Sequence, residues 1–187
     1  LLAMYSSLAG GIAVDPACMT VPVDDHLVHR GDGVFESLKC VDRAIYNLDA
    51  HLDRLAQSAR AIGLGIPFER PALRDILRAV ARAAGVDSCA LRVLVSRGVG
   101  TMSVDPDACR GPQLYAVAYP LLDPPDDWIE RGVRVGVSSI PAKSPFFARI
   151  KSCNYLPNAL MKAEANRRGR HFVLSLDASG HLAEGPT

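Results

Sequence analysis

The chain has 187 residues, which is enough for one large domain or two small ones with a buried core. Apolar residues make up 49% of the chain, charged residues make up 22%, and the formal net charge is +1. This balance is typical of a globular protein, and it gives no reason to expect a nucleic-acid or anionic-membrane partner.

The five cysteines are widely spaced and form no CxxC pair: Cys18, Cys40, Cys89, Cys109 and Cys153. An odd number of scattered cysteines favours reduced thiols. No apolar run approaches the length of a membrane span and no signal-peptide pattern opens the chain, so we expect a cytoplasmic protein. His26 and His29 have no matching cysteine or carboxylate ligand nearby, so we expect no metal site.

The first twenty residues are short apolar pieces with few long-range cues, and the readable pattern begins at Val34. Residues 34–40 and 44–48 flank a polar turn, which predicts a β-hairpin. Asp49 is placed to cap a helix whose apolar residues recur at steps of three and four until Gly63. A second helix is predicted between Pro71 and Gly85, with the same spacing of apolar residues.

The second half of the chain predicts strands at 90–95, 114–119 and 133–137, a helix after Lys151, and a hairpin over 172–184. The Pro-rich stretch in the middle is the most linker-like segment. We therefore expect an α+β fold with antiparallel hairpins, rather than alternating βαβ units. The predicted organisation is a domain over 1–120, a linker over 121–130, and a second domain over 131–187.

Three side chains stand out as candidates for chemistry. Lys151 follows an apolar strand-like run and precedes a helix, Glu184 shares a strand face with Leu182, and Arg54 lies away from the apolar stripe of its helix. Alone, each has an ordinary alternative as a solvated surface side chain. Together, an amine, a carboxylate and a guanidinium are the groups that an enzyme needs to hold pyridoxal phosphate.

The order and local sequence of these residues resemble a known family. Residues 24–36 (DDHLVHRGDGVFE), 51–55 (HLDRL), 150–158 (IKSCNYLPN) and 180–185 (GHLAEG) are similar to four motifs of the class IV aminotransferases, the fold type IV pyridoxal-phosphate enzymes. The resemblance implies a two-domain fold with a small N-terminal α/β domain. It also implies a larger cofactor-binding domain that continues beyond Glu184, so we expect 131–187 to be only its beginning and the chain to be truncated.

Carried over residue by residue, the resemblance implies that Lys151 forms the Schiff base with the cofactor and moves the proton during the reaction. Arg54 would bind the phosphate, Glu184 the ring nitrogen and Tyr155 the phenolic oxygen. The implied reaction transfers an amino group between an amino acid, of D-amino-acid or branched-chain type, and a 2-keto acid. Family members are commonly homodimers, so a homodimer is expected.

Substrate contacts are predicted at Phe35, within the first motif, and at Arg97, which follows a strand and could bind a carboxylate. Well-known D-amino-acid enzymes carry an Arg-x-His pair where this chain has Gly98–Ser103, so the handedness of the substrate stays open. Two alternatives also stay open. One is an aminodeoxychorismate-lyase type of elimination that releases pyruvate, and the other is a truncated, inactive homologue that acts by association.

Overall fold

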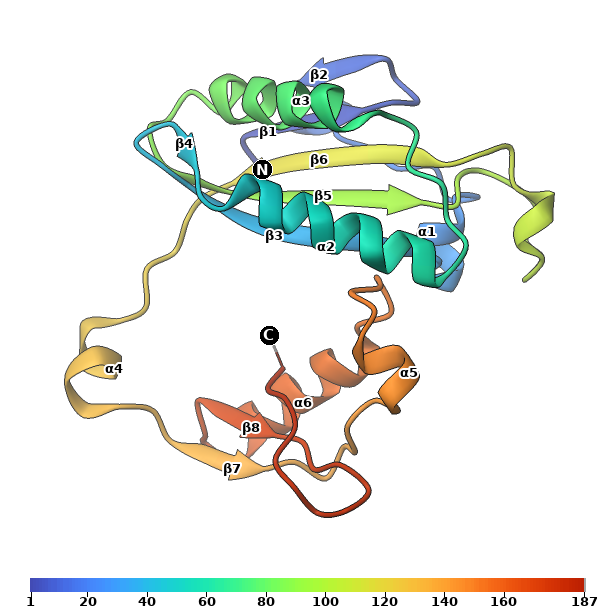
Figure 1. The fold of residues 1–187 in the computed structure, drawn as a ribbon. Coiled ribbons are helices and arrows are strands. Elements are labelled where there is room, and N and C mark those ends of the chain that lie inside the picture. Colours follow the sequence, from blue (N-terminus) through green and yellow to red (C-terminus); the bar gives the residue numbers. More distant parts are fainter. Residues whose placement is uncertain (187) are drawn as a thin grey trace. The chain divides into compact units, whose positions relative to one another are not determined.

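The computed structural model describes residues 1–186, and the chain divides into two units (Figure 1). Unit 1 comprises Leu1–Leu121 together with Ile150–Cys153, and unit 2 comprises Leu122–Arg149 together with the chain from Asn154 onward. The chain therefore leaves unit 1 after Leu121 and returns to it only for the short segment around Lys151.

A six-stranded sheet in the order β2-β1-β6-β5-β3-β4 forms the centre of unit 1, and all its neighbouring strands are antiparallel. Its strands are β1 (Ala3–Ser6), β2 (Gly11–Ala13), β3 (Gly33–Val41), β4 (Ala44–Ile45), β5 (Cys89–Ser96) and β6 (Gln113–Tyr119). The predicted strands at 34–40, 90–95 and 114–119 are confirmed. The hairpin of β1 and β2 was not predicted, because its strands are short and only the turn at Gly10, with φ of 72°, marks it.

The hairpin of β3 and β4 turns at Asp42 and Arg43, whose φ values are 49° and 65°. Two positive φ values in a two-residue loop match the twist of the flanking strands. Neither residue is glycine, so the turn needs support from outside. Arg43 supplies it by donating its backbone N–H to the Asp87 carbonyl at 2.8 Å, while its Nε lies 2.7 Å from the Asp87 carboxylate.

Helices α2 (Leu48–Ala61) and α3 (Arg70–Ala83) pack on the sheet, α2 on β3 and α3 on β1, β5 and β6 (Figure 1). Their buried apolar positions are those of the predicted stripes: Leu52, Leu55, Ala59, Leu73, Leu77 and Val80. Burying each leucine side chain contributes roughly 1.5–3 kcal/mol, so these stripes hold both helices on the sheet. No helix within residues 1–186 is both long and apolar enough to cross a membrane.

The prediction that Asp49 caps α2 is wrong. The helix begins at Leu48, and its N-cap is Asn47, which has a φ of 48° and makes no side-chain cap hydrogen bond. Asp49 instead accepts hydrogen bonds from Arg70 and Arg74 of α3. These arginines draw the carboxylate toward the neighbouring helix, and a single sequence does not reveal that packing.

A fully buried carboxylate ties the short elements of unit 1 to the sheet. Asp25 caps α1 (His26–Arg30) by accepting the Leu27 N–H at 2.9 Å. Its second oxygen accepts the hydroxyls of Ser96 at 2.9 Å and Tyr115 at 2.8 Å. Three donors compensate the loss of water around this charge, which holds the chain before β3 against β5 and β6. Two 3₁₀ turns, Pro16–Cys18 and Pro106–Ala108, complete the unit.

Unit 2 is smaller, and its elements are α4 (Asp126–Arg131), β7 (Val135–Val137), α5 (Pro145–Ala148), α6 (Leu156–Arg167) and β8 (Phe172–Leu174). The strands β7 and β8 are parallel, with α6 between them in the chain and packed on β8. The expectation of antiparallel hairpins alone is therefore wrong for this unit. The apolar core here consists of Met161, Ala165 and Val173, with Ile140 packed against it.

The predicted hairpin over 172–184 forms only in part. Its turn is present, because Asp177 donates its N–H to the His181 carbonyl at 2.9 Å and its carbonyl accepts the Gly180 N–H at 3.0 Å. Beyond the turn, the second strand is reduced to a single bridge between Leu176 and Leu182. Ser175 extends this pairing, because it donates its N–H to the Glu184 carbonyl at 2.9 Å and accepts the Ala183 N–H at 3.0 Å.

A buried carboxylate also organises unit 2. Glu164 of α6 accepts the Ser138 hydroxyl at 2.8 Å and the Ser139 N–H at 3.0 Å, and it lies 2.9 Å from Nη1 of Arg168. These donors, with the Ser138 hydroxyl contributing most, lower the pKa of the Glu164 carboxyl to about 2. Glu164 therefore anchors the chain that follows β7 to the helix.

We expect Glu164→Gln to flatten the acid dependence of the stability of unit 2. Because the pKa of Glu164 is lower in the folded chain than its ordinary value of 4.5, its contribution is fully present above pH 4.5 and is lost as the pH falls toward 2. Urea unfolding followed by the fluorescence of Trp128, whose ring centroid lies 5.3 Å from that of Phe172, measures this. If the free energy of unfolding falls equally with decreasing pH in wild type and Glu164→Gln, the role given to Glu164 is wrong. Glu130→Gln, at an exposed position, is the control.

Candidate functional site

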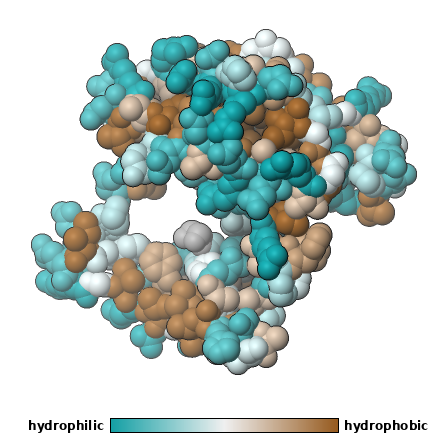
Figure 2. Space-filling model, in the orientation of Figure 1, coloured by the Kyte–Doolittle hydropathy of each residue, from teal (hydrophilic) through white to brown (hydrophobic). Residues whose placement is uncertain are grey.

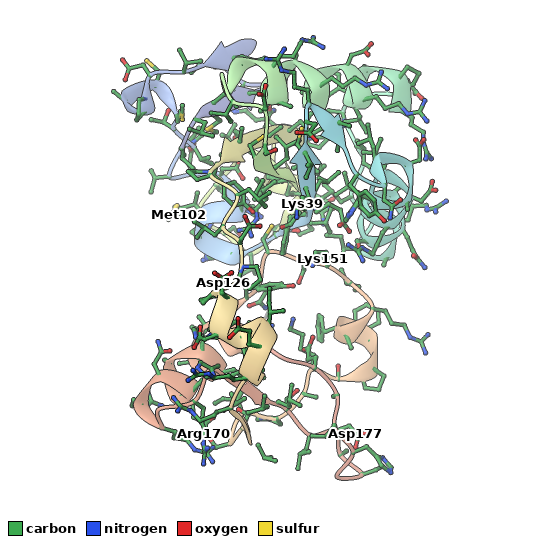
Figure 3. All side chains as sticks on the ribbon, turned by 90° about the vertical axis from the view of Figure 1, so that its left-hand side faces the viewer. Lys39, Met102, Asp126, Lys151, Arg170 and Asp177 are labelled. Carbon is green, nitrogen blue, oxygen red and sulfur yellow. The ribbon has the colours of Figure 1, made fainter. Side chains whose placement is uncertain are left out.

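The segment that carries Lys151 is bonded to β3 as a short additional strand. Phe35 donates its N–H to the Lys151 carbonyl at 2.9 Å, and Cys153 donates to the Gly33 carbonyl at 2.9 Å. The backbone N–H of Lys151 donates to the hydroxyl of Ser58 on α2 at 3.1 Å. Both backbone groups of the lysine are thus satisfied, and Figure 3 shows the residue below the strands of unit 1.

The amine of Lys151 lies over an aromatic ring. Its Nζ is 4.8 Å from the ring centroid of Phe35, which is 7% exposed. Side chains alternate along a strand, so Phe35 points to the sheet face opposite to that of Val34, which packs in the helix-covered core. Arg92 lies over the same ring, with its Cζ 5.2 Å from the centroid. The ring therefore places the lysine beside an apolar surface instead of in open water.

Arg54 is held by a buried carboxylate. Glu36 is completely buried on β3, on the face toward α2, and its two oxygens lie 2.5 Å from Nε and Nη2 of Arg54. His51, one turn earlier on α2, places its Nδ1 2.8 Å from the same carboxylate. The two parallel contacts fix the plane of the guanidinium, while 53% of the Arg54 side chain stays exposed.

Helix α2 brings Arg54 and Lys151 into one neighbourhood. Arg54 and Ser58 are four residues apart, so they lie on the same side of the helix. Arg54 contacts β3 through Glu36, and Ser58 accepts the N–H of Lys151. Of the predicted site residues, Lys151, Arg54 and Phe35 therefore all belong to unit 1, where Phe35 contacts the amine of Lys151 and Glu36, the next residue of β3, holds Arg54.

A thiol lies two residues from the lysine and offers no second nucleophile. Burial raises the pKa of the Cys153 thiol to about 12. A thiol with that pKa remains protonated at neutral pH, and the thiolate is the reactive form. The amine of Lys151 is consequently the nucleophilic group of the segment Ile150–Cys153.

Arg97 makes several contacts within unit 1. Its Nε and Nη2 each lie 3.0 Å from an oxygen of Asp32, and the guanidinium also donates to the carbonyls of Ile62 and Gly63. The side chain is 16% exposed. These contacts tie the end of α2 to the loop before β3, so they favour a structural role for Arg97 over the predicted contact with substrate.

Tyr155 and Glu184 belong to unit 2, where both contact Lys143. The Nζ of Lys143 lies 4.5 Å from the ring centroid of Tyr155 and 3.8 Å from Oε1 of Glu184. The side chain of Lys143 is only 14% exposed, whereas that of Glu184 is 40% exposed. The backbone of Glu184 is fixed by Ser175, whose N–H donates to the Glu184 carbonyl at 2.9 Å.

Sequence reasoning assigned no role to Glu36, His51, Ser58 or Lys143. The sequence does contain a signal for Glu36. It lies two positions from both Val34 and Leu38, so it shares the buried face of their strand, and a buried carboxylate needs partners. No comparable signal marks Lys143, since it lies in a loop between prolines. Within residues 1–186, no group of three or more histidine, cysteine or acidic side chains is placed to hold a metal ion.

We expect Arg54→Met to lower the free energy of unfolding by about 1–3 kcal/mol, because it leaves the buried charge of Glu36 with His51 as its remaining ionisable partner. The half-exposed position of Arg54 favours the lower end of that range. Adding Glu36→Gln to Arg54→Met should recover part of the loss, which a double-mutant cycle in urea measures. Arg60→Met, at an exposed position of the same helix, is the control. If the changes in unfolding free energy caused by Arg54→Met and Glu36→Gln simply add in the double variant, the two side chains are not coupled.

Comparison with known proteins links this arrangement to a family. The protein-family model described as "Amino-transferase class IV" matches residues 33–187 of this chain. The chain is 41% identical, over 99% of its length and 49% of that relative, to the "D-amino-acid transaminase, chloroplastic" of Arabidopsis thaliana. It is 30% identical, over 98% of its length and 64% of that relative, to the "Bifunctional aminodeoxychorismate lyase / D-amino acid transaminase" of Mycobacterium tuberculosis.

A solved structure confirms the predicted fold class. The branched-chain amino acid aminotransferase of Escherichia coli superposes with a TM-score of 0.88 at 26% identity. The match covers 98% of this chain and 62% of that structure. The chain thus spans between about half and two thirds of the length of these relatives.

Proposed function

The chain belongs to the class IV aminotransferases, and on that premise we propose that it moves an amino group between an amino acid and a 2-keto acid with pyridoxal phosphate as cofactor. The observation that carries the proposal is the setting of Lys151. Its backbone is bonded to β3 and α2, and its amine lies over Phe35, in the unit where Glu36 fixes Arg54.

The residues of unit 1 fit two parts of the cofactor. The guanidinium of Arg54, with its plane fixed by Glu36, is suited to two parallel hydrogen bonds with a phosphate. When bound, pyridoxal phosphate supplies an aldehyde that combines with amines and a ring that accepts electrons. The amine of Lys151 would hold the aldehyde carbon and then take up and return the proton at the α-carbon of the amino acid. Phe35 would pack beside the reacting groups.

The residues of unit 2 have roles toward the ring. The carboxylate of Glu184 would pair with the ring nitrogen and keep it protonated, which strengthens the ring as an electron acceptor. The hydroxyl of Tyr155 would donate to the phenolic oxygen. Lys143 contacts both side chains, so it positions them relative to each other within this unit.

The proposed substrate is a D-amino acid or a branched-chain amino acid. Relatives named for both classes support this range, and the 41% identity to a D-amino-acid transaminase favours the first class.

We also propose that residues 121–130 form the linker between a domain over 1–120 and a second domain over 131–187. Helix α4, Asp126–Arg131, begins within this linker. The proposed assembly is a homodimer.

A cytoplasmic location is also proposed. All five cysteines are free, and Cys40 and Cys89 lie opposite each other in β3 and β5 without a disulfide. Burial raises the pKa of the Cys89 thiol to about 11, so this pair is held in the protonated state. Adjacent reduced thiols in a sheet are compatible with a reducing compartment.

The proposal is tested by the absorption spectrum of the 187-residue chain with pyridoxal phosphate. We expect a visible band of lysine-bound cofactor that converts to the absorption of the amine form on addition of D-alanine. Lys151→Ala should abolish both the band and its conversion, because the attachment point is lost, whereas Lys39→Ala, an exposed lysine of β3, should leave both unchanged. Retention of the band in Lys151→Ala would overturn the role given to this residue.

One relative is also named as a lyase, so an elimination that releases pyruvate is the second candidate. The two reactions share the lysine and the cofactor and differ in the product. Pyruvate released from aminodeoxychorismate without any keto acid supports the lyase, and keto-acid-dependent amine transfer supports the aminotransferase. If the 187-residue chain holds no cofactor, the spectrum is repeated with a chain that continues beyond Thr187. A band in the longer chain keeps the first two candidates, and no band there supports the third candidate, an inactive chain that acts by association.

We expect Lys143→Met to weaken the affinity for pyridoxal phosphate by up to about five- to thirtyfold, because it removes a partly shielded ion pair and a cation–π contact worth about 0.5–1 kcal/mol each. Lys143→Arg should retain most of the affinity, since it keeps the charge near Tyr155 and Glu184. Equilibrium dialysis of the cofactor measures the change. Equal affinity of wild type and Lys143→Met would show that Lys143 positions neither side chain.

A further inference from the structure

A face of α3 carries arginines at every fourth position. Arg74, Arg78 and Arg82 follow one another along the helix, and side chains four residues apart are neighbours on its surface. Like charges at this spacing destabilise a helix. The row therefore works against the stability of α3 unless anions lie beside it.

The acids of unit 1 compensate only one end of this row. Asp49 of α2 contacts Arg74, at a distance of 2.9 Å from its Nε. Within residues 1–186, the ion pair of Arg78 is with Asp75, with the nearest atoms 3.8 Å apart and both side chains mostly exposed. No ion pair joins Arg82 to an acid within residues 1–186. Two adjacent guanidinium groups at the C-terminal end of α3 are thus left with weak compensation.

These arginines line a cavity of about 910 Å³ between α3, β4 and the beginning of α2. Arg43, from the turn of the β3–β4 hairpin, also lines it, as does Asp49, whose carboxylate is paired with Arg70 and Arg74. The apolar lining is formed by Ile45, Leu48, Ala81 and Val86. In Figure 2, brown residues lie between teal ones in the upper left of the molecule, which is the region of α3 and β4 in Figure 1. The volume is within the range of about 300–1,000 Å³ that is typical of small-molecule sites.

We propose that this cavity, named here the α3 groove, binds a small organic phosphate with an apolar or aromatic body. A phosphate monoester carries up to two negative charges and three acceptor oxygens, which suits two neighbouring guanidinium groups better than a single carboxylate does. Placed between Arg78 and Arg82, it relieves their repulsion. Its apolar body then covers Ile45 and Val86, the latter being 43% exposed.

The α3 groove is distinct from the proposed cofactor site. None of Lys151, Arg54 and Phe35 lines it, although all of them belong to unit 1. Pyridoxal phosphate is itself an aromatic phosphate monoester, so the test uses a probe that lacks the aldehyde and separates the two sites by variants. The inference does not depend on the proposed function, because it concerns a different surface.

The test is a calorimetric titration, in which the heat of binding is measured as phenyl phosphate is added to the 187-residue chain. We expect saturable binding that weakens at least tenfold in the double variant Arg78→Gln/Arg82→Gln. Arg60→Gln, an exposed arginine of α2 outside the groove, should bind as wild type does. Unchanged binding by the double variant would overturn the proposal.

Two further probes test the class of ligand. We expect inorganic phosphate and phenol to bind more weakly than phenyl phosphate, because each provides only half of the proposed contacts. Equal binding of inorganic phosphate would exclude a role for the apolar lining, and equal binding of phenol would exclude a role for the arginines. Methyl signals of Ala81 and Val86 should shift on titration with phenyl phosphate, and their constancy would overturn the location. Circular dichroism of the double variant checks that the exposed substitutions leave the fold intact.

Discussion

The carboxylate of Glu36 is completely buried in unit 1, and an unpaired charge in such a place costs several kcal/mol. The sheet can accommodate it only when α2 lies across β3 with His51 and Arg54 turned toward the strand. The same placement presents Ser58 to the backbone of Lys151. One buried charge therefore fixes the position of the helix, the orientation of a guanidinium and the docking of the segment that carries the amine.

The two units use this kind of constraint in the same way. In unit 1, Asp25 accepts three donors and joins the chain before β3 to the sheet. In unit 2, Glu164 joins the chain after β7 to α6. Each carboxylate is compensated by hydroxyl and backbone donors, so it links segments without a large apolar contact. Irregular connections near the candidate site are thereby held in place.

Local sequence patterns were sufficient to predict the elements that bury a regular stripe of their own apolar residues. Alternation along β3 and the apolar spacing of α2 and α3 predicted those elements, because each buries a regular stripe. Asp49, the return strand after β8 and Lys143 differed from expectation or carried no signal, since contacts with distant segments decide their positions. The motif around Lys151 identified the residue, but its bonds to β3 and Ser58 join parts of the chain that no local pattern relates.

The return of Ile150–Cys153 to β3 has a consequence for how the chain folds during synthesis. The strands of unit 1 leave the ribosome first, but the edge of β3 near Gly33 and Phe35 stays unpaired until the residues around Lys151 have followed. An open strand edge is a template for pairing with other chains. Nascent unit 1 is therefore most prone to aggregation in the interval before Lys151 emerges, and synthesis of the amine-bearing segment closes that interval.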